Sequence, residues 1–131
     1  RHWVYPSHIP RREYQVAIVQ SALLSNTLCC LPTGLGKTMI AAVVMYNYYR
    51  WFPEGKIVFI APTKPLVEQQ IEACRKKTGL PSIVTQELTG NIKVEDRARL
   101  WEQKRVFYCT PATLNNDLAK GICPMEKIVC L

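Results

Sequence analysis

The chain has 131 residues, 48% hydrophobic and 21% charged, which is the balance of an ordinary globular domain or part of one. Seventeen Lys and Arg residues against ten Asp and Glu give a net charge of +7, which favours polyanionic partners. No apolar run approaches the roughly 20 residues of a membrane span, and the first residues lack a signal-peptide core. We therefore expect a nuclear or cytosolic protein without a membrane partner.

The first predicted elements lie before residue 53. The stretch up to Pro10 contains two prolines and should be irregular. Residues 12–23 predict a helix, because Tyr14, Ile18 and Ala22 recur at helical spacing. The short apolar run 26–31 predicts a buried strand, and residues 37–52 predict a long helix after a glycine-rich turn.

Strands and helices alternate along the rest of the chain. Strands are predicted over 56–61, 82–88, 105–110 and 127–131, and helices over 65–77, 94–103 and 111–119. This alternation predicts an α/β fold: a parallel sheet with helices on both faces and right-handed crossovers. Ligands of such folds bind at the carboxyl ends of the strands.

Six cysteines are spread over the chain, most of them inside apolar runs and without a paired spacing. We expect reduced core thiols of an intracellular protein, and neither a disulfide framework nor a zinc site. They are Cys29, Cys30, Cys74, Cys109, Cys123 and Cys130.

The sequence LPTGLGKT, residues 31–38, predicts a phosphate-binding loop. It follows a predicted strand and opens a predicted helix, so backbone N–H groups and the helix dipole would surround an anion. Lys37 would contact the β- and γ-phosphates of ATP, and the Thr38 hydroxyl would bind Mg²⁺. Leu31 departs from the general pattern, which has glycine there. The predicted nucleotide-binding loop comprises Pro32, Thr33, Gly34, Leu35, Gly36, Lys37 and Thr38.

Two residues upstream of the loop are candidates for the adenine contact. The Gln15 amide could pair with both the donor and the acceptor edge of adenine. Arg12, one turn earlier, could stack its planar guanidinium on the ring. When these letters are read alone, a surface Arg and Gln on an amphipathic helix is the better explanation.

Threonines follow three of the predicted strands. Parallel strands end at the same edge of a sheet, so these hydroxyls and neighbouring backbone N–H groups could contact a nucleic-acid phosphate chain. Each of these dipeptides is common in loops and indicates little alone. Their order after a phosphate-binding loop is a strong joint signal for a nucleic-acid site. The residues are Thr63, Lys64 and Pro65, then Thr89 and Gly90, then Thr110 and Pro111.

Together these motifs resemble the first RecA-like domain of superfamily 2 helicases. Gln15 matches the family's adenine-reading Q motif, PTGLGKT its motif I and APTKPLVEQQ its motif Ia. The stretches RHWVYP, CLPTGLGKTMIAAVVMYNYYRWFPEGK and NDLAKGICP resemble one branch, the Fanconi anaemia group M and Hef-type DNA translocases. Leu31 is usual in that branch. The resemblance covers essentially the whole chain and is weakest between Thr78 and Lys104.

The resemblance implies that residues 1–131 are the N-terminal part of the ATP-binding RecA-like domain 1, ending before motif II. The full protein would then be a nuclear ATP-dependent DNA helicase or translocase. It would remodel branched DNA, such as replication forks and junctions, together with repair-complex proteins. The acids of motif II and the second RecA-like domain are needed for hydrolysis, so the fragment alone should be inactive.

Three alternatives stay open at the sequence level. A double-stranded-RNA helicase or sensor of the Dicer type shares the Q motif and motif I, and these motifs contact mainly backbone. A catalytically inactive helicase fold could serve as a binding module, although Lys37 and Thr38 are intact. A small-molecule P-loop kinase would not need the threonine series.

Overall fold

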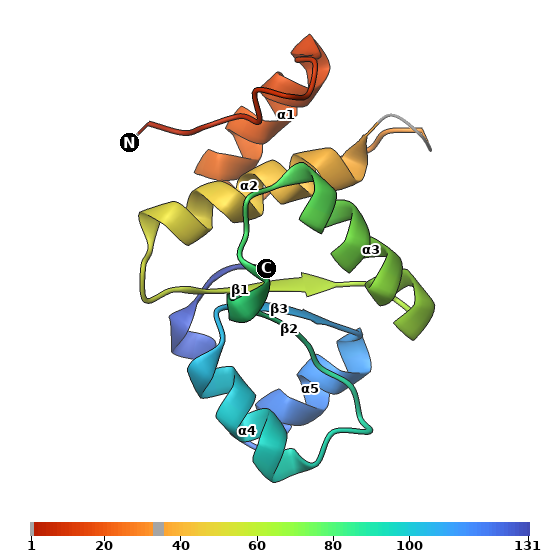
Figure 1. Cartoon of the computed structure of the whole chain (residues 1–131), viewed down its shortest axis with the longest axis vertical. Coiled ribbons are helices and arrows are strands. Elements are labelled where there is room, and N and C mark those ends of the chain that lie inside the picture. Colours follow the sequence, from red (N-terminus) through yellow and green to blue (C-terminus); the bar gives the residue numbers. More distant parts are fainter. Residues whose placement is uncertain (1, 33–35) are drawn as a thin grey trace.

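The computed structural model describes residues 2–32 and 36–131 (Figure 1). Its helices are α1 (Glu13–Leu24), α2 (Lys37–Trp51), α3 (Lys64–Lys77), α4 (Val94–Gln103) and α5 (Pro111–Ala119). Its strands are β1 (Lys56–Ile60), β2 (Thr85–Glu87), β3 (Val106–Cys109) and β4 (Ile128–Cys130). Short 3₁₀ turns at Ser82–Val84 and Met125–Lys127 precede β2 and β4.

The strands form one parallel sheet in the order β2-β3-β1-β4. β1 and β3 lie at the centre, with Ile57 opposite Val106 and Ile60 opposite Cys109. All four strands run the same way, so the segments that follow β1, β2 and β3 meet at one carboxyl edge. The α/β fold predicted from the alternation of elements is confirmed.

Side chains of β1 alternate between the two faces of the sheet, as the period of a strand requires. Ile57 packs with Ala42 of α2 and Val67 of α3, whereas Val58 packs with Trp101 of α4 and Leu114 of α5. Helices α2 and α3 therefore cover one face, and α4 and α5 cover the other (Figure 1). This confirms the predicted helices on both faces.

Helix α1 and the N-terminal segment form an outer layer on α2 (Figure 1). Val19 and Leu23 of α1 pack against α2, where Val43 is buried. The Asn47 side chain, fully buried in α2, accepts a hydrogen bond from Val4 N at 2.7 Å and donates one to Val4 O at 2.9 Å. These contacts hold the irregular N-terminal segment along α2.

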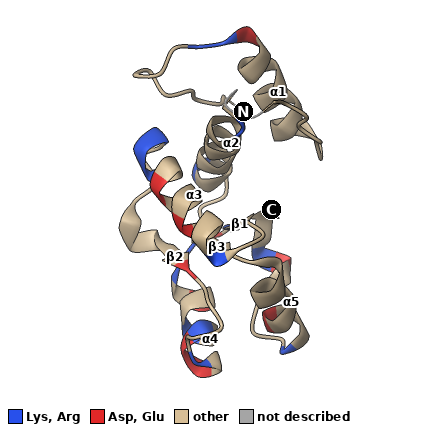
Figure 2. Ribbon diagram, turned by 90° about the vertical axis from the view of Figure 1, so that its right-hand side faces the viewer, with Lys and Arg blue, Asp and Glu red and all other residues tan. Residues whose placement is uncertain are grey.

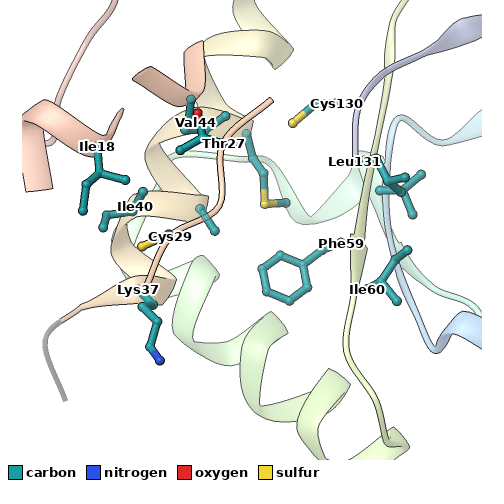
Figure 3. Close-up of a pocket in the computed structure, with 14 residues that line it drawn as sticks. Ile18, Thr27, Cys29, Lys37, Ile40, Val44, Phe59, Ile60, Cys130 and Leu131 are labelled. Carbon is teal, nitrogen blue, oxygen red and sulfur yellow. The ribbon is translucent and has the colours of Figure 1, made fainter. Parts of the chain in front are cut away.

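The strand predicted over residues 26–31 is wrong. These residues are non-helical and unpaired with the sheet, and Leu28 is 88% exposed. The physical reason is that Cys29 and Leu31 of this segment pack against the apolar cluster of α1 and α2, so the apolar run is partly buried without a strand ladder. The segment instead leaves an apolar slot of about 470 Å³ between itself, α2, β1 and β4 (Figure 3).

The predicted starts of two other strands are also wrong. Residues 82–84 and 127 were expected to be extended, but they belong to the 3₁₀ turns. Each turn directly follows a proline, Pro81 or Pro124, whose missing N–H cannot join a ladder.

The prediction that the cysteines are buried core thiols is confirmed for some of them and wrong for Cys30. All six cysteines are free; Cys74, Cys109 and Cys123 are buried as expected. Cys30 is exposed, because its predicted strand does not form, so its assignment to the core is wrong.

Candidate nucleotide and nucleic-acid sites

The last glycine of the predicted phosphate loop is placed as that loop requires. Gly36 is the N-cap of α2 and has the left-handed angles φ 86° and ψ 34°, which suit glycine because it has no Cβ. Lys37 opens the helix with an exposed side chain, and Thr38 follows, half-buried. Pro32 is exposed before the turn. Thr33, Gly34 and Leu35 lie outside the described residues.

Gln15 lies directly against this glycine turn. A Cβ atom added at Gly36 would come 2.1 Å from Gln15 Nε2. The Gln15 side chain is 5% exposed, and its Oε1 accepts a hydrogen bond from the Tyr5 hydroxyl at 3.3 Å. The structure thus brings together Gln15 and Gly36, which lie twenty-one residues apart in the sequence.

Arg12 occupies a different environment. It precedes α1, is exposed, and donates a hydrogen bond from Nη1 to the Tyr14 hydroxyl at 3.1 Å. This hydrogen bond raises the pKa of Arg12. Its side chain is oriented by Tyr14, whereas that of Gln15 lies against the turn.

Thr38 makes a contact that the sequence analysis did not find. Its hydroxyl donates a hydrogen bond to Gln70 Oε1 of α3 at 2.9 Å, in a half-buried position. Gln70 lies within the APTKPLVEQQ stretch, but two adjacent glutamines gave no signal for which one faces α2. Val67 and Cys74, three residues before and four after, place Gln70 on the packed face of α3, where it is half-buried and Gln69 is exposed.

Residues from three strand ends surround one hollow of about 210 Å³ at the carboxyl edge, called here the strand-end hollow. Among the predicted nucleic-acid contacts, it is lined by Lys64, Thr89, Gly90 and Thr110. Asn91 and Thr113, which the sequence analysis missed, also line it. The prediction that these separate segments meet at one edge agrees with this placement, although their role stays a prediction.

The threonines at two of these ends also have a structural role. Thr63 Oγ1 accepts a hydrogen bond from Leu66 N, and Thr110 Oγ1 accepts one from Thr113 N, both at 3.4 Å. These residues are therefore the N-caps of α3 and α5. Pro65 and Pro111 occupy the first turns, where a missing N–H costs nothing. Thr110 lines the strand-end hollow, whereas Thr63, Pro65 and Pro111 are next to lining residues in the sequence and do not line it.

Charge is not concentrated at the strand-end hollow. Of its lining residues, Lys64 is cationic and Glu87 acidic. The densest basic run, Arg75, Lys76 and Lys77, lies in the last turn of α3, at the opposite end of that helix (Figure 2). The net charge of +7 therefore does not by itself indicate that nucleic acid binds at the strand-end hollow.

Two further features are absent from the described part of the chain, a metal-binding cluster and a membrane-spanning helix. No group of three His, Cys, Asp or Glu side chains comes close enough together to hold a metal ion there. No helix among the described residues is both long and apolar enough to cross a membrane.

A parallel α/β sheet whose glycine turn opens a helix with Lys and Thr defines the class of P-loop nucleotide-binding domains. More specifically, this chain belongs to the DEAD/DEAH box helicase family, whose family pattern matches residues 12–130. Helicase domains of this family bind nucleotide.

Two curated relatives match nearly all of the chain. "ATP-dependent DNA helicase fml1" of Schizosaccharomyces pombe is 56% identical over 129 residues, covering 98% of this chain and 16% of that protein. "DEAD-box ATP-dependent RNA helicase FANCM" of Arabidopsis thaliana is 57% identical over 131 residues, covering 98% of this chain and 10% of that protein. The chain thus spans a small part of the length of the relatives it matches.

A solved structure supports both the fold and the branch. The Pyrococcus furiosus Hef helicase domain superposes with a TM-score of 0.84 at 36% identity, covering 95% of this chain and 27% of that one. The RecA-like fold and the resemblance to the Fanconi anaemia group M and Hef branch are confirmed.

Proposed function

We propose that the protein containing this chain is a nuclear, ATP-dependent DNA helicase or translocase that remodels branched DNA together with repair-complex proteins. Residues 1–131 are the N-terminal part of its first RecA-like domain. The observation that carries this proposal is the contact between α2 and α3: the helix that begins at Lys37 touches, through Thr38 and Gln70, the helix that begins at the strand-end hollow. The Schizosaccharomyces pombe relative is named as an ATP-dependent DNA helicase, which supports DNA as the substrate.

The turn before α2 binds the phosphates of ATP in this proposal. Gly36 has no Cβ, so backbone can approach a phosphate closely, and the exposed Lys37 ammonium contacts the β- and γ-phosphates. The remaining loop contacts come from Pro32, Thr33, Gly34 and Leu35. Gln15, already against Gly36, contacts adenine, and Arg12 stacks on the ring after leaving Tyr14.

Mg²⁺ fits the donor set at the start of α2. The hydroxyl oxygen of Thr38 is a hard ligand that Mg²⁺ accepts, and Mg²⁺ commonly takes few protein ligands and keeps waters and phosphate oxygens. When bound, the ion neutralises charge on the phosphates. The acids that complete its shell belong to motif II and are not contained in residues 1–131.

The strand-end hollow contacts the DNA backbone. Lys64 supplies a charge, and Thr89 and Gly90 supply a loop. Thr63 and Pro65 begin α3 and Thr110 and Pro111 begin α5, and the positive end of each helix dipole attracts phosphate. Such contacts position a strand without reading its sequence. Changes in the closure of two domains around ATP would move these contacts along DNA.

The test uses the complete protein with a fork-shaped DNA, a linear DNA duplex and a double-stranded RNA of matched length. We expect DNA to stimulate ATP hydrolysis, the fork to be converted to new products, and Lys37→Ala to remove nearly all turnover. If Lys37→Ala retains a tenth or more of the wild-type rate, the role of Lys37 is wrong.

A second candidate function is a double-stranded-RNA helicase, because the Arabidopsis thaliana relative is named as an RNA helicase. Stimulation by RNA alone would select it over the DNA proposal. An absence of hydrolysis with every nucleic acid would instead indicate an inactive binding module.

A further inference from the structure

We propose that Gln70 is a positioning residue: it orients the Thr38 hydroxyl toward Mg²⁺ and, through α3, links nucleotide binding to the strand-end hollow. The inference rests on the proposed function and adds a residue to it. Gln70 stands outside the nucleotide-binding loop and outside the strand ends, yet it makes the side-chain hydrogen bond that joins α2 to α3 at 2.9 Å.

The direction of this hydrogen bond decides what Thr38 can do. A threonine hydroxyl has one proton to donate and lone pairs to offer. With its proton directed at Gln70 Oε1, Thr38 Oγ1 can present its lone pairs to a cation at the start of α2. A ligand oxygen held in this way needs no reorientation when the metal binds, and loss of such partners typically weakens metal affinity about 10–100-fold.

Helix α3 fixes the place of Gln70. Val67 is 2% exposed and Cys74 is 1% exposed, and both lie on the helix face that also carries Gln70. The Cys74 thiol contacts the Tyr108 side chain of β3, and burial raises the pKa of that thiol. Because this face is packed on the sheet, α3 cannot roll at Gln70 without disturbing its contacts along the helix.

The other end of the same helix reaches the strand-end hollow. Lys64 and Val67 line it, and Gln70 lies only one turn beyond Val67. Mg²⁺–nucleotide at Thr38 therefore acts on α3 through Gln70, and a phosphate chain acts on the same helix through Lys64. These two residues lie about 10 Å apart along the helix axis. Binding at one site then changes affinity at the other, and by linkage the factor is the same in both directions.

The test measures equilibrium binding of a fluorescent ADP derivative to the complete protein, with Mg²⁺ or with EDTA, and with or without a DNA duplex. The variants are Gln70→Ala, Gln70→Glu, which keeps an oxygen acceptor, and the matched control Gln69→Ala, whose side chain is exposed on the same helix. Melting temperatures of all variants show whether each is folded.

We expect Gln70→Ala to weaken ADP binding about tenfold in Mg²⁺ but not in EDTA. In Gln70→Ala, the factor by which DNA changes ADP affinity should fall toward one. Gln70→Glu should restore both the ADP affinity in Mg²⁺ and the effect of DNA. Gln69→Ala should behave as wild type. Wild-type behaviour of Gln70→Ala, or an equal loss in EDTA, overturns the inference while the proposed function stands. A wild-type protein that binds neither ADP nor DNA overturns both.

Discussion

The Arg97 guanidinium of α4 and the Asp117 carboxylate of α5 form a buried ion pair. Arg97 Nε donates to both carboxylate oxygens, at 3.0 and 3.1 Å, and Nη2 lies 3.0 Å from Oδ1. Trp101 Nε1 donates to Oδ2 at 2.9 Å, and Asp117 is fully buried. Arg97 Nη1 also donates to the carbonyl of Ile92, so the pair holds the loop that carries Thr89 and Gly90.

Removing one partner of this pair should be costly. Asp117→Ala leaves the Arg97 charge buried without a counter-charge, and we expect a loss of about 3–5 kcal/mol in the free energy of unfolding. The double variant Arg97→Met/Asp117→Leu removes both charges and should recover most of that loss. Native-state hydrogen exchange of the α4 and α5 amides measures the local stability. Equal losses in both variants would assign the effect to packing instead of charge.

Much of this fold could be predicted because its signals are local. The apolar period, the Pro residues at helix starts and the glycine turn specify α2, α3 and α5. The buried polar residues could not be predicted, because a partner distant in sequence decides whether such a residue is buried. Lys56 is an example: it is 5% exposed, with Nζ donating to the carbonyls of Glu102 and Lys104, and burial lowers its pKa.

The same reasoning explains the uneven result at the site. Four residues of the strand-end hollow, Lys64, Thr89, Gly90 and Thr110, were predictable, because parallel strands must end at one edge whatever their side chains contact. The contact of Gln70 with Thr38 could not be predicted, because it depends on how α3 is rotated against α2. The strand wrongly predicted over 26–31 shows another limit: an apolar run indicates burial, but Cys29 and Leu31 pack against α1 and α2 instead of joining the sheet.

Substitution of Gly36 should prevent the glycine turn from binding nucleotide. Gly36→Ala places a Cβ in the left-handed region, at a cost of about 1–2 kcal/mol, and moves the Gln15 amide that lies 2.1 Å from that position. Gly90→Ala is the matched control, because its Cβ would meet no atom within 4 Å. We expect ADP affinity to fall in Gly36→Ala and to stay near wild type in Gly90→Ala, as measured by fluorescence titration. Equal affinities would remove the turn from the site.

The position of Gln15 predicts discrimination between adenine and guanine. An amide that contacts adenine through both a donor and an acceptor cannot pair in the same way with guanine. Gln15→Ala should therefore weaken ATP use and bring the kcat/KM values for ATP and GTP closer together. The measurement is the ratio of these two values in the complete protein. An unchanged ratio would place Gln15 outside the adenine site, with Tyr5 as its structural partner.

The buried thiols should make stability depend on alkaline pH. Burial raises the pKa of Cys109 from an ordinary 9.0 to about 12 and that of Cys123 to about 11. The folded state therefore keeps these thiols protonated where the unfolded state ionises them. Their contribution is complete below pH 9 and is lost as pH rises from 9 to about 12. Urea midpoints between pH 8 and 11 measure the decline. Cys109→Ala should reduce it, whereas Cys30→Ala, at an exposed site, should not.

Residues 1–131, purified alone, should associate and should not hydrolyse ATP. Leu131 is 74% exposed beside the apolar slot, and β4 is an edge strand of the sheet that the described residues form, so two copies can cover each other there. Leu131→Asn should reduce association more than Leu24→Asn, since Leu24 is 87% exposed but does not line the slot. Size-exclusion chromatography at several concentrations measures this difference.

DNA binding by the same piece should be weak and strongly salt-dependent, because phosphate contacts carry it. Hydrolysis should be absent, because the acids of motif II and the arginines of a second domain are not contained in these residues. The measurement is ATP turnover of the purified piece with and without duplex DNA. DNA-stimulated hydrolysis that Lys37→Ala abolishes would show that the residues described here already form a complete catalytic site, and would refute their assignment as part of one.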